Sequence, residues 1–398
     1  MSFSEWKKYR VGDIAKVKNG FAFKGKDFIS SGVPVIKIKN VKPGKILLND
    51  LSYVSREVAD NASKYKINVG DILITMSGNR IDGSPDSWVG KVAMFREEGE
   101  YLLNQRVGII EINSKKIDSI FLSYLLSSIQ TQQHFITKAN SSGGQANISP
   151  DIIHDTEFFA PDLPEQKQIA SILRSIDDTI ENNQQINKTL EEMAKAIFKE
   201  WFVDFNFPNA TGKFQETEIG KIPVGWKSMK LNEALEIKYG KDHKHLQDGE
   251  FPVYGSGGIM RYAEKPLYES ESILIPRKGT LSNLFYINKP FWTVDTMFYS
   301  KIKIKNSGKY LFHLLQTLNL ASMNVGSAVP SLTTEVLNNI QIAMPDENTL
   351  KEFEKIVSSL FNQAEQNIAE NQSLINLRDT LLPKLMKREI EIREKETV

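Results

Sequence analysis

The polar side chains best suited to recognising another molecule lie in loops between apolar segments, in two separate blocks. Arg and Lys suit guanine edges, Asn and Gln suit adenine, Asp suits cytosine, and Lys, Arg and Ser also bind phosphates. In the first block the candidate DNA-binding residues are Asn19, Lys24, Lys37, Asn40, Asn79, Arg80, Gln105, Arg106, Gln145 and Asn147. In the second they are Lys241, His243, Lys244, Tyr254, Ser256, Arg277, Lys278, Asn283 and Asp295. For each, the alternative is a solvated polar group on the surface.

Catalytic motifs are scarce. No Pro-Pro exists, so the Asn/Asp-Pro-Pro-aromatic loop of an amino-methyltransferase is absent, and no phosphate-binding P-loop occurs. Gly255-Ser256-Gly257-Gly258 lacks the spacing of a dinucleotide fingerprint and favours a turn. Glu236-Ile237-Lys238 has the form of a nuclease step, but such triplets arise often by chance, and His243 with His245 favours a basic loop over a metal site. We predict no catalytic residue, no metal and no cofactor bound by this chain.

Charge is distributed unevenly along the 398 residues, although the formal net charge is only +1. Residues 1–50 hold eleven Lys/Arg against four Asp/Glu, and residues 227–310 hold fourteen against nine. Residues 163–205 and 346–382 are acidic, with five against eight and three against seven. Two basic blocks that can release counterions from phosphates favour DNA as a partner. The lack of cysteine and of a long apolar run predicts a cytoplasmic chain with no membrane contact.

The two blocks repeat one order of predicted elements. In the first, residues 33–41 alternate as a strand, residues 69–78 form a Gly-bounded strand, and residues 121–136 form a helix. In the second, SILIPRKGT at 272–280 parallels DILITMSGN at 71–79, and KYLFHLLQTL at 309–318 parallels the helix. Near the end of each block Pro161 parallels Pro345. We call the difference between these two residue numbers the repeat offset, and we add it to a residue number of the first block to find the equivalent residue of the second. This predicts an α+β fold in which one scaffold carries two different sets of loops.

A long helix follows each block, and its apolar residues recur in heptads. For residues 163–205 we place Ile169, Ile176, Asn183, Leu190 and Ile197 at position a and Ile172, Thr179, Ile186, Met193 and Glu200 at position d. The repeat offset then gives the second helix, from Asp346, with Phe353, Leu360, Asn367, Leu374 and Leu381 at a and Ile356, Gln363, Glu370, Leu377 and Lys384 at d. This spacing predicts an antiparallel coiled coil. Asn183 and Asn367 share one heptad position and would fix the register, unless each faces solvent.

The sequence resembles the specificity subunits of type I DNA restriction–modification enzymes over nearly its whole length. The resemblance rests on GDILITMSG, SILIPRKGT, GGQANIS, the junction PDLPEQKQIASILRSIDD and the closing RDTLLPKLMKREI; the second junction, PDENTLKEF, lacks the EQ step. It implies two target-recognition domains, each reading half of a split double-stranded DNA sequence. It also implies helices that act as spacer and docking site for two methyltransferase subunits, where S-adenosylmethionine is used, and restriction subunits that join the assembly.

The expected domains are residues 1–162 and 208–345 for recognition and residues 163–207 and 346–398 for the helices. The alternatives are a free-standing bipartite DNA-binding regulator and, with less support, a self-contained modification enzyme. Against the regulator, we expect an apolar outer face on the first helix that calls for a protein partner. Its predicted docking residues are Leu173, Ile180, Phe198, Trp201 and Phe202.

Overall fold

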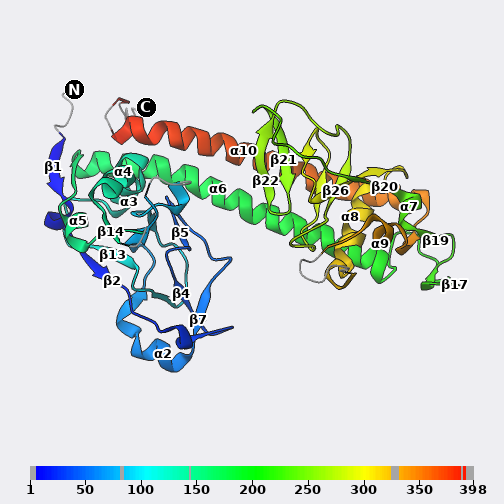
Figure 1. Ribbon diagram of the computed structural model, residues 1–398, viewed down its shortest axis with the longest axis horizontal. Helices are drawn as coiled ribbons and strands as arrows, with labels where there is room; N and C mark the ends of the chain where they lie inside the picture. The colour runs from blue at the N-terminus through cyan, green and yellow to red at the C-terminus, as the bar shows by residue number, and fades with distance from the viewer. Residues whose placement is uncertain (1–5, 81–84, 143–144, 324–330, 387–388, 391–398) are drawn as a thin grey trace, which may run out of the picture. The chain divides into compact units, whose positions relative to one another are not determined.

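The computed structural model describes residues 6–80, 85–142, 145–323, 331–386 and 389–390. The chain divides into two compact units, Met1–Asn182 with Glu370–Val398 (unit 1) and Asn183–Ala369 (unit 2). Each unit therefore holds part of the long helices α6 (Leu163–Phe198) and α10 (Glu347–Met386), drawn in green and in orange to red in Figure 1. No described helix combines the length and apolar character needed to span a membrane. The bounds of the four expected domains stay a prediction.

Unit 1 is built on a four-stranded antiparallel sheet with the order β11-β9-β13-β2. The strands are β2 (Ala15–Asn19), β9 (Ile72–Thr75), β11 (Val92–Met94) and β13 (Val107–Ile112). Successive side chains of a strand point to opposite faces, so Ile72 and Ile74 enter one apolar cluster while Leu73 enters another. The sheet is thus covered on both faces, which explains why β9 is a continuous apolar run and not an alternating one.

Smaller elements complete unit 1. Its further strands are β1 (Lys7–Arg10) paired with β16 (Glu157–Ala160); β3 (Phe28–Ile29), β7 (Ser52–Val54), β4 (Val33–Ile36), β12 (Tyr101–Leu103) and β8 (Lys66–Ile67) in one sheet; β10 (Ser77–Gly78), β15 (Gln145–Asn147) and β14 (Asn140–Ser142) in another; and β5 (Val41–Lys42) with β6 (Lys45–Ile46). Its short helices are α1 (Val11–Ile14), α2 (Arg56–Asn61), α3 (Ser119–Ser127), α4 (Ile129–Lys138) and α5 (Pro150–His154). The helix predicted at 121–136 is broken, because the Ser128 hydroxyl accepts from Thr131 N and caps a new helix. The strand predicted at 33–41 likewise ends at Ile36.

Unit 2 repeats this architecture, which confirms the predicted α+β class and the two-fold repeat. Its main sheet, β20-β26-β23-β24, consists of β20 (Leu235–Tyr239), β26 (Met297–Ile302), β23 (Ser272–Pro276) and β24 (Phe285–Ile287). The other elements are β17 (Phe214–Thr217), β18 (Gly220–Pro223), β19 (Lys227–Lys230), β21 (Phe251–Gly255), β22 (Gly258–Ala263), β25 (Trp292–Thr293), β27 (Gln341–Met344), α7 (Leu231–Ala234), α8 (Gly308–Thr317) and α9 (Thr334–Asn338). Lys227 pairs with Met344 as Lys7 pairs with Ala160, and the repeat offset that takes Pro161 to Pro345 also takes Ala160 to Met344.

The long helices bury one heptad seam. In α6 and the π-helical turn Lys199–Val203 after it, the seam positions, each buried or half-buried, are Gln166, Ile169, Leu173, Ile176, Ile180, Asn183, Asn187, Leu190, Ala194, Ile197 and Trp201. In α10 they are Leu350, Phe353, Val357, Leu360, Ala364, Asn367, Asn371, Leu374, Arg378, Leu381 and Leu385. Both series step alternately by three and four residues, and the repeat offset relates each member of the first to one of the second. Every predicted a position belongs to the seam, whereas every predicted d position is exposed, so the d assignment was wrong.

The contacts in unit 1 confirm that the helices run antiparallel, because the residue number rises along one helix while it falls along the other. In unit 1, Arg378 bonds Asp177 and Asn371 Nδ2 donates to Ile180 O at 3.5 Å. In unit 2, Asn367 Nδ2 donates to Asn187 Oδ1 at 2.8 Å, and Asn187 Nδ2 donates to Ala364 O at 3.2 Å. Both predicted register residues, Asn183 and Asn367, are buried. The Asn367 amide donates to Asn187 Oδ1 and accepts from Gln363 Nε2, so the part that the two residues play in the register stays a prediction.

Candidate nucleic-acid interface

In unit 1, three polar side chains meet where β9, β13 and β15 approach one another. Ser77 Oγ donates to Asn147 Oδ1 at 2.6 Å, and Arg106 NH1 donates to Ser77 Oγ at 3.2 Å and to Asn147 Oδ1 at 3.3 Å. Arg106 and Asn147 were predicted site residues, whereas Ser77 was not among the candidates. Its signal was its place two residues after the end of the buried strand β9, where a polar side chain leaves the sheet.

Strand register explains this meeting. Thr75 pairs with Val107, which places Arg106 beside the end of β9, and Ser77 pairs with Asn147 across β10 and β15. Asn19 ends β2 opposite Gly108 and so lies at the same end of the sheet, with the exposed Gln105 before β13. Gly20 permits this approach, because a Cβ there would lie 2.3 Å from Asn104 O.

The chemistry of this cluster suits base or phosphate recognition. A guanidinium carries five N–H donors, and the bonds to Ser77 and Asn147 both use NH1 of Arg106. These bonds orient an otherwise exposed side chain, which lowers the entropy that a ligand contact would cost. A pre-oriented Arg beside an Asn amide is a combination that can read a guanine or an adenine edge.

Unit 2 has the same backbone frame with different side chains. The Arg277 N–H donates to Thr296 O, and the Arg277 carbonyl accepts from Leu332 N. Met76 makes the same two backbone bonds, to Arg106 O and from Ile148 N. An arginine thus replaces a methionine at one backbone position. The Arg277 guanidinium donates to Asp295 O at 3.0 Å and lies 5.3 Å from the ring centre of Tyr239.

A hairpin turn borders this second cluster. Asn283 Nδ2 donates to Ser256 O at 2.6 Å, in the turn between β21 and β22. Gly279, at φ +88°, approaches Ser256 so closely that a Cβ would lie 3.3 Å from its Oγ. The glycine run Gly255–Gly258 is therefore a β-hairpin turn and not the strand-to-helix loop that holds a dinucleotide phosphate. Burial raises the pKa of Tyr254 on the adjoining strand.

The remaining predicted site residues in unit 1 do not join its cluster in any contact among the described residues. Lys24 is exposed beside a short 3₁₀ turn, Gln145 and Asn79 are exposed, and the exposed Arg80 donates to Ala139 O at 3.0 Å. Lys37 Nζ lies 3.4 Å from the ring centre of Phe28, and burial, then Lys39, lowers its pKa.

The structure contradicts the predicted DNA-binding role of Asn40. It is 1% exposed, its Oδ1 accepts from Lys37 N, and its Nδ2 donates to Leu47 O and Asp50 O at 3.0 and 3.1 Å. All of its bonds therefore support a turn of the chain, and it offers no group to DNA.

The basic loop of unit 2 remains solvated. Lys241, Lys244 and Lys278 are exposed, and so is Asp295, while His243 is half-buried. Lys278 forms a backbone bridge to Ser331, the counterpart of the pairing between Ser77 and Asn147. Glu236 pairs with Lys238 on the exposed surface of β20, so this triplet is an ordinary surface ion pair. Within the described part of the chain, no group of three His, Cys, Asp or Glu side chains lies close enough to hold a metal.

The structure also contradicts the prediction that five residues of the first helix dock a partner, because none of the five is exposed. Leu173 is fully buried in the core of unit 1, and Phe198, Trp201 and Phe202 are 3–8% exposed in the core of unit 2. Ile180 is 7% exposed. The outer face that we expected to meet a partner is the face on which each globular unit packs, and the exposed apolar residues of α6 are Ile172, Ile186 and Met193.

Comparisons with known proteins agree with this architecture. The chain matches the family described as Type I restriction modification DNA specificity domain over residues 3–192 and 223–375. It is 26% identical to the type I restriction enzyme HindI specificity subunit of Haemophilus influenzae, with 97% of this chain and 100% of that protein covered. It is 24% identical to the type I restriction enzyme MjaIX specificity subunit of Methanocaldococcus jannaschii, covering 98% and 94%. The crystal structure of a type I restriction–modification S subunit from M. genitalium superposes with a TM-score of 0.60, at 18% identity and 96% coverage of both chains.

Proposed function

Since the chain belongs to the family of type I restriction modification DNA specificity domains, we propose that it reads a two-part DNA sequence, one half-site per unit, for a type I restriction–modification enzyme. The chain itself performs no catalysis in this proposal. It positions methyltransferase subunits, which use S-adenosylmethionine to methylate adenine, and restriction subunits on the DNA that it has bound.

One observation carries this proposal. Two units keep the same backbone frame, yet place Met76, Ser77 and Arg106 in one and Arg277, Lys278 and Thr296 in the other at equivalent positions. Repetition of the frame is expected for two domains that grip the same kind of ligand. Replacement of nearly every polar group at its end is expected when the two must read different bases.

The two clusters supply the reading groups. In unit 1 we assign Arg106 and Asn147 to base edges, with Asn19, Gln105 and Gln145 around them. In unit 2 we assign Arg277, Asn283 and Asp295 to base edges, with Ser256 and Tyr254 at the bordering hairpin. The exposed lysines Lys24, Lys241, Lys244 and Lys278, with His243, Asn79 and Arg80, are assigned to phosphates, which take cations without reading sequence.

The long helices would separate the half-sites and hold the enzyme subunits. Forty helical residues extend about 60 Å, and half-sites one DNA turn apart are separated by ~34–36 Å. Docking then falls to the apolar side chains that remain exposed, which are Ile172 in unit 1 and Ile186 and Met193 in unit 2. Exposed apolar groups repeated along one helix are the type of surface that a protein partner covers.

Paired variants test the proposal. The chain is co-expressed with its methyltransferase subunits, and methylated adenines are mapped in the host DNA for the parent, Arg106→Ala and Arg277→Ala. Each variant should relax base choice in one half-site, by about 1–3 kcal/mol per lost contact, and leave the other half-site unchanged. Lys188→Ala, on the exposed side of α6 in unit 2, is the control. If one variant altered both half-sites equally, or if the parent supported no methylation at a two-part sequence, the proposal would be wrong. Tight specific binding by the chain alone, with no methylation in the complete complex, would favour the free-standing regulator.

A further inference from the structure

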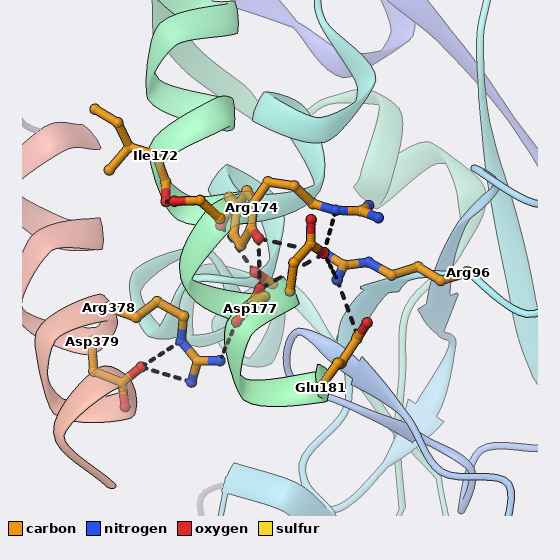
Figure 2. A network of polar contacts seen from close by, with 11 residues as sticks. Arg96, Ile172, Arg174, Asp177, Glu181, Arg378 and Asp379 are labelled. Atoms are coloured by element: carbon orange, nitrogen blue, oxygen red, sulfur yellow. Dashed lines mark hydrogen bonds and ion pairs between the residues drawn. The ribbon is translucent and has the colours of Figure 1, made fainter. Parts of the chain in front are cut away.

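A partly buried ionic network joins the globular part of unit 1, which we call its body, to both long helices. Arg378 NH1, on α10, donates to Asp177 Oδ1, on α6, at 2.9 Å. Arg96, from the segment after β11, lies 3.8 Å from Asp177 Oδ2 and 3.1 Å from Glu181 Oε1. Figure 2 shows Asp177 between these two guanidinium groups, with Glu181 beside Arg96. Every member belongs to unit 1.

A tyrosine from the body completes the network. Tyr124 OH, on α3, donates to Asp177 Oδ2 at 2.5 Å, and Arg96 NH2 approaches the same hydroxyl at 3.5 Å. Burial and the neighbouring Asp177 raise the pKa of Tyr124, so its hydroxyl keeps the proton that it donates. The carboxylate of Asp177 therefore has partners from three directions, the segment after β11, α3 and α10.

Because its central side chains are largely buried, the network limits how far the body can rotate on the helices. The side chains of Asp177, Arg96 and Arg378 are 11%, 17% and 27% exposed. Charges at that depth are poorly screened, and each hydrogen bond to them is directional. Apolar packing, by contrast, is non-directional and tolerates small rotations. An ion-pair network between the body and the helices thus restricts how one can turn on the other.

Unit 2 is attached by different chemistry at the equivalent place. The repeat offset places Phe361 at the position of Asp177 and Ala194 at that of Arg378. On α8, His313 packs against Phe361 with ring centres 6.0 Å apart, where α3 has Tyr124 against Asp177. The pair Lys289–Glu365, at 3.0 Å, is the counterpart of Arg96 with Glu181. At another position, Lys309 Nζ on α8 donates to Glu354 Oε1 on α10 at 2.6 Å. Unit 2 thus has its own buried ion pair between body and helix. The carboxylate that meets a segment after a strand, a body helix and the other long helix belongs to unit 1.

We propose that Asp177 is a positioning residue, which fixes the angle of the unit 1 reading cluster on the helix pair and so restricts the spacer length over which the first half-site is read. The inference rests on the proposed function. One added base pair moves a half-site by about 3.4 Å and turns it by roughly 34–36°. A body held rigidly on its helix cannot follow that rotation, whereas a loosened one can.

The experiment uses the full chain in complex with its methyltransferase subunits and DNA carrying the native spacer or a spacer longer or shorter by one base pair. The ratio of methylation rates, altered spacer to native, is measured for the parent, Asp177→Asn, Asp177→Glu and the matched control Glu365→Gln. Asp177→Asn should raise this ratio by about tenfold, as expected when one charge-assisted hydrogen bond no longer opposes the rotation. Asp177→Glu, which retains the charge, and Glu365→Gln should keep the parent ratio.

A purely structural role would lower the rates on all spacers together, and an unchanged ratio for Asp177→Asn would therefore overturn the inference. Arg378→Gln, which leaves Asp177 paired with Arg96 and Tyr124, provides a second and milder variant and should raise the ratio less. If Asp177→Asn does not fold, an unchanged ratio for Arg378→Gln overturns the inference equally. A parent complex that ignores two-part sequences would instead refute the proposed function, so the two failures are distinguishable.

Discussion

Neighbouring residues on α6 give the sharpest test of how the long helices pack. Leu173 is fully buried among Ile169, Ala170 and Leu385, whereas Ile172 is 37% exposed. Replacing a buried leucine by alanine removes its transfer free energy and leaves a cavity, so Leu173→Ala should cost about 3 kcal/mol. Ile172→Ala should cost about 1 kcal/mol or less. Helix propensity does not confuse the comparison, because alanine is the better helix former in both cases.

Calorimetry of the full chain measures the difference. For a unit of roughly 200 residues, 3 kcal/mol lowers the melting temperature of the unit 1 transition by about 6–12 °C. The transition of unit 2 should stay in place for both variants, which makes it an internal control. A larger loss for Ile172→Ala than for Leu173→Ala would restore the heptad assignment with Ile172 in the seam and refute the packing described here.

Three further outcomes are expected. His313 is buried and its pKa is lowered to about 4, so the unfolded chain takes up a proton near pH 6.5 and the folded chain only near pH 4. Unit 2 should therefore lose stability as the pH falls through that window, and the advantage of His313→Phe over the parent should grow by about 1.4 kcal/mol per pH unit in urea titrations; a constant difference would contradict the assignment. Asn40→Ala should leave its three backbone partners unpaired and destabilise unit 1 by about 3 kcal/mol in the same titrations, with no change in the bases that are methylated. Gly20→Ala should disrupt the end of β2, because its Cβ would meet Asn104 O, and should therefore reduce recognition of the unit 1 half-site. Unaltered methylation at that half-site would show that Gly20 does not shape the reading cluster.

The sequence alone determined the repeat and the period of the helices. Apolar strands and turns recur in the two blocks, and the repeat offset that they indicated also relates the buried seams of α6 and α10. It also placed Arg106 and Asn147 among the ten candidates of the first block, because loops at strand ends are where polar side chains leave a sheet. Those features depend on local pattern, which the sequence contains completely.

Tertiary structure decided which apolar positions of each heptad are buried. With Ile169 at position a, Ile172 falls at d and Leu173 at e, and both are apolar. Both positions flank the a positions on the helix surface, so periodicity alone cannot decide which of the two is buried. The choice follows from the globular units, whose cores cover the side of Leu173, Phe198 and Phe202 and leave Ile172 exposed. The same reason removed Asn40 from the candidate site, because its partners Leu47 and Asp50 reach it only through a turn that no local pattern specifies.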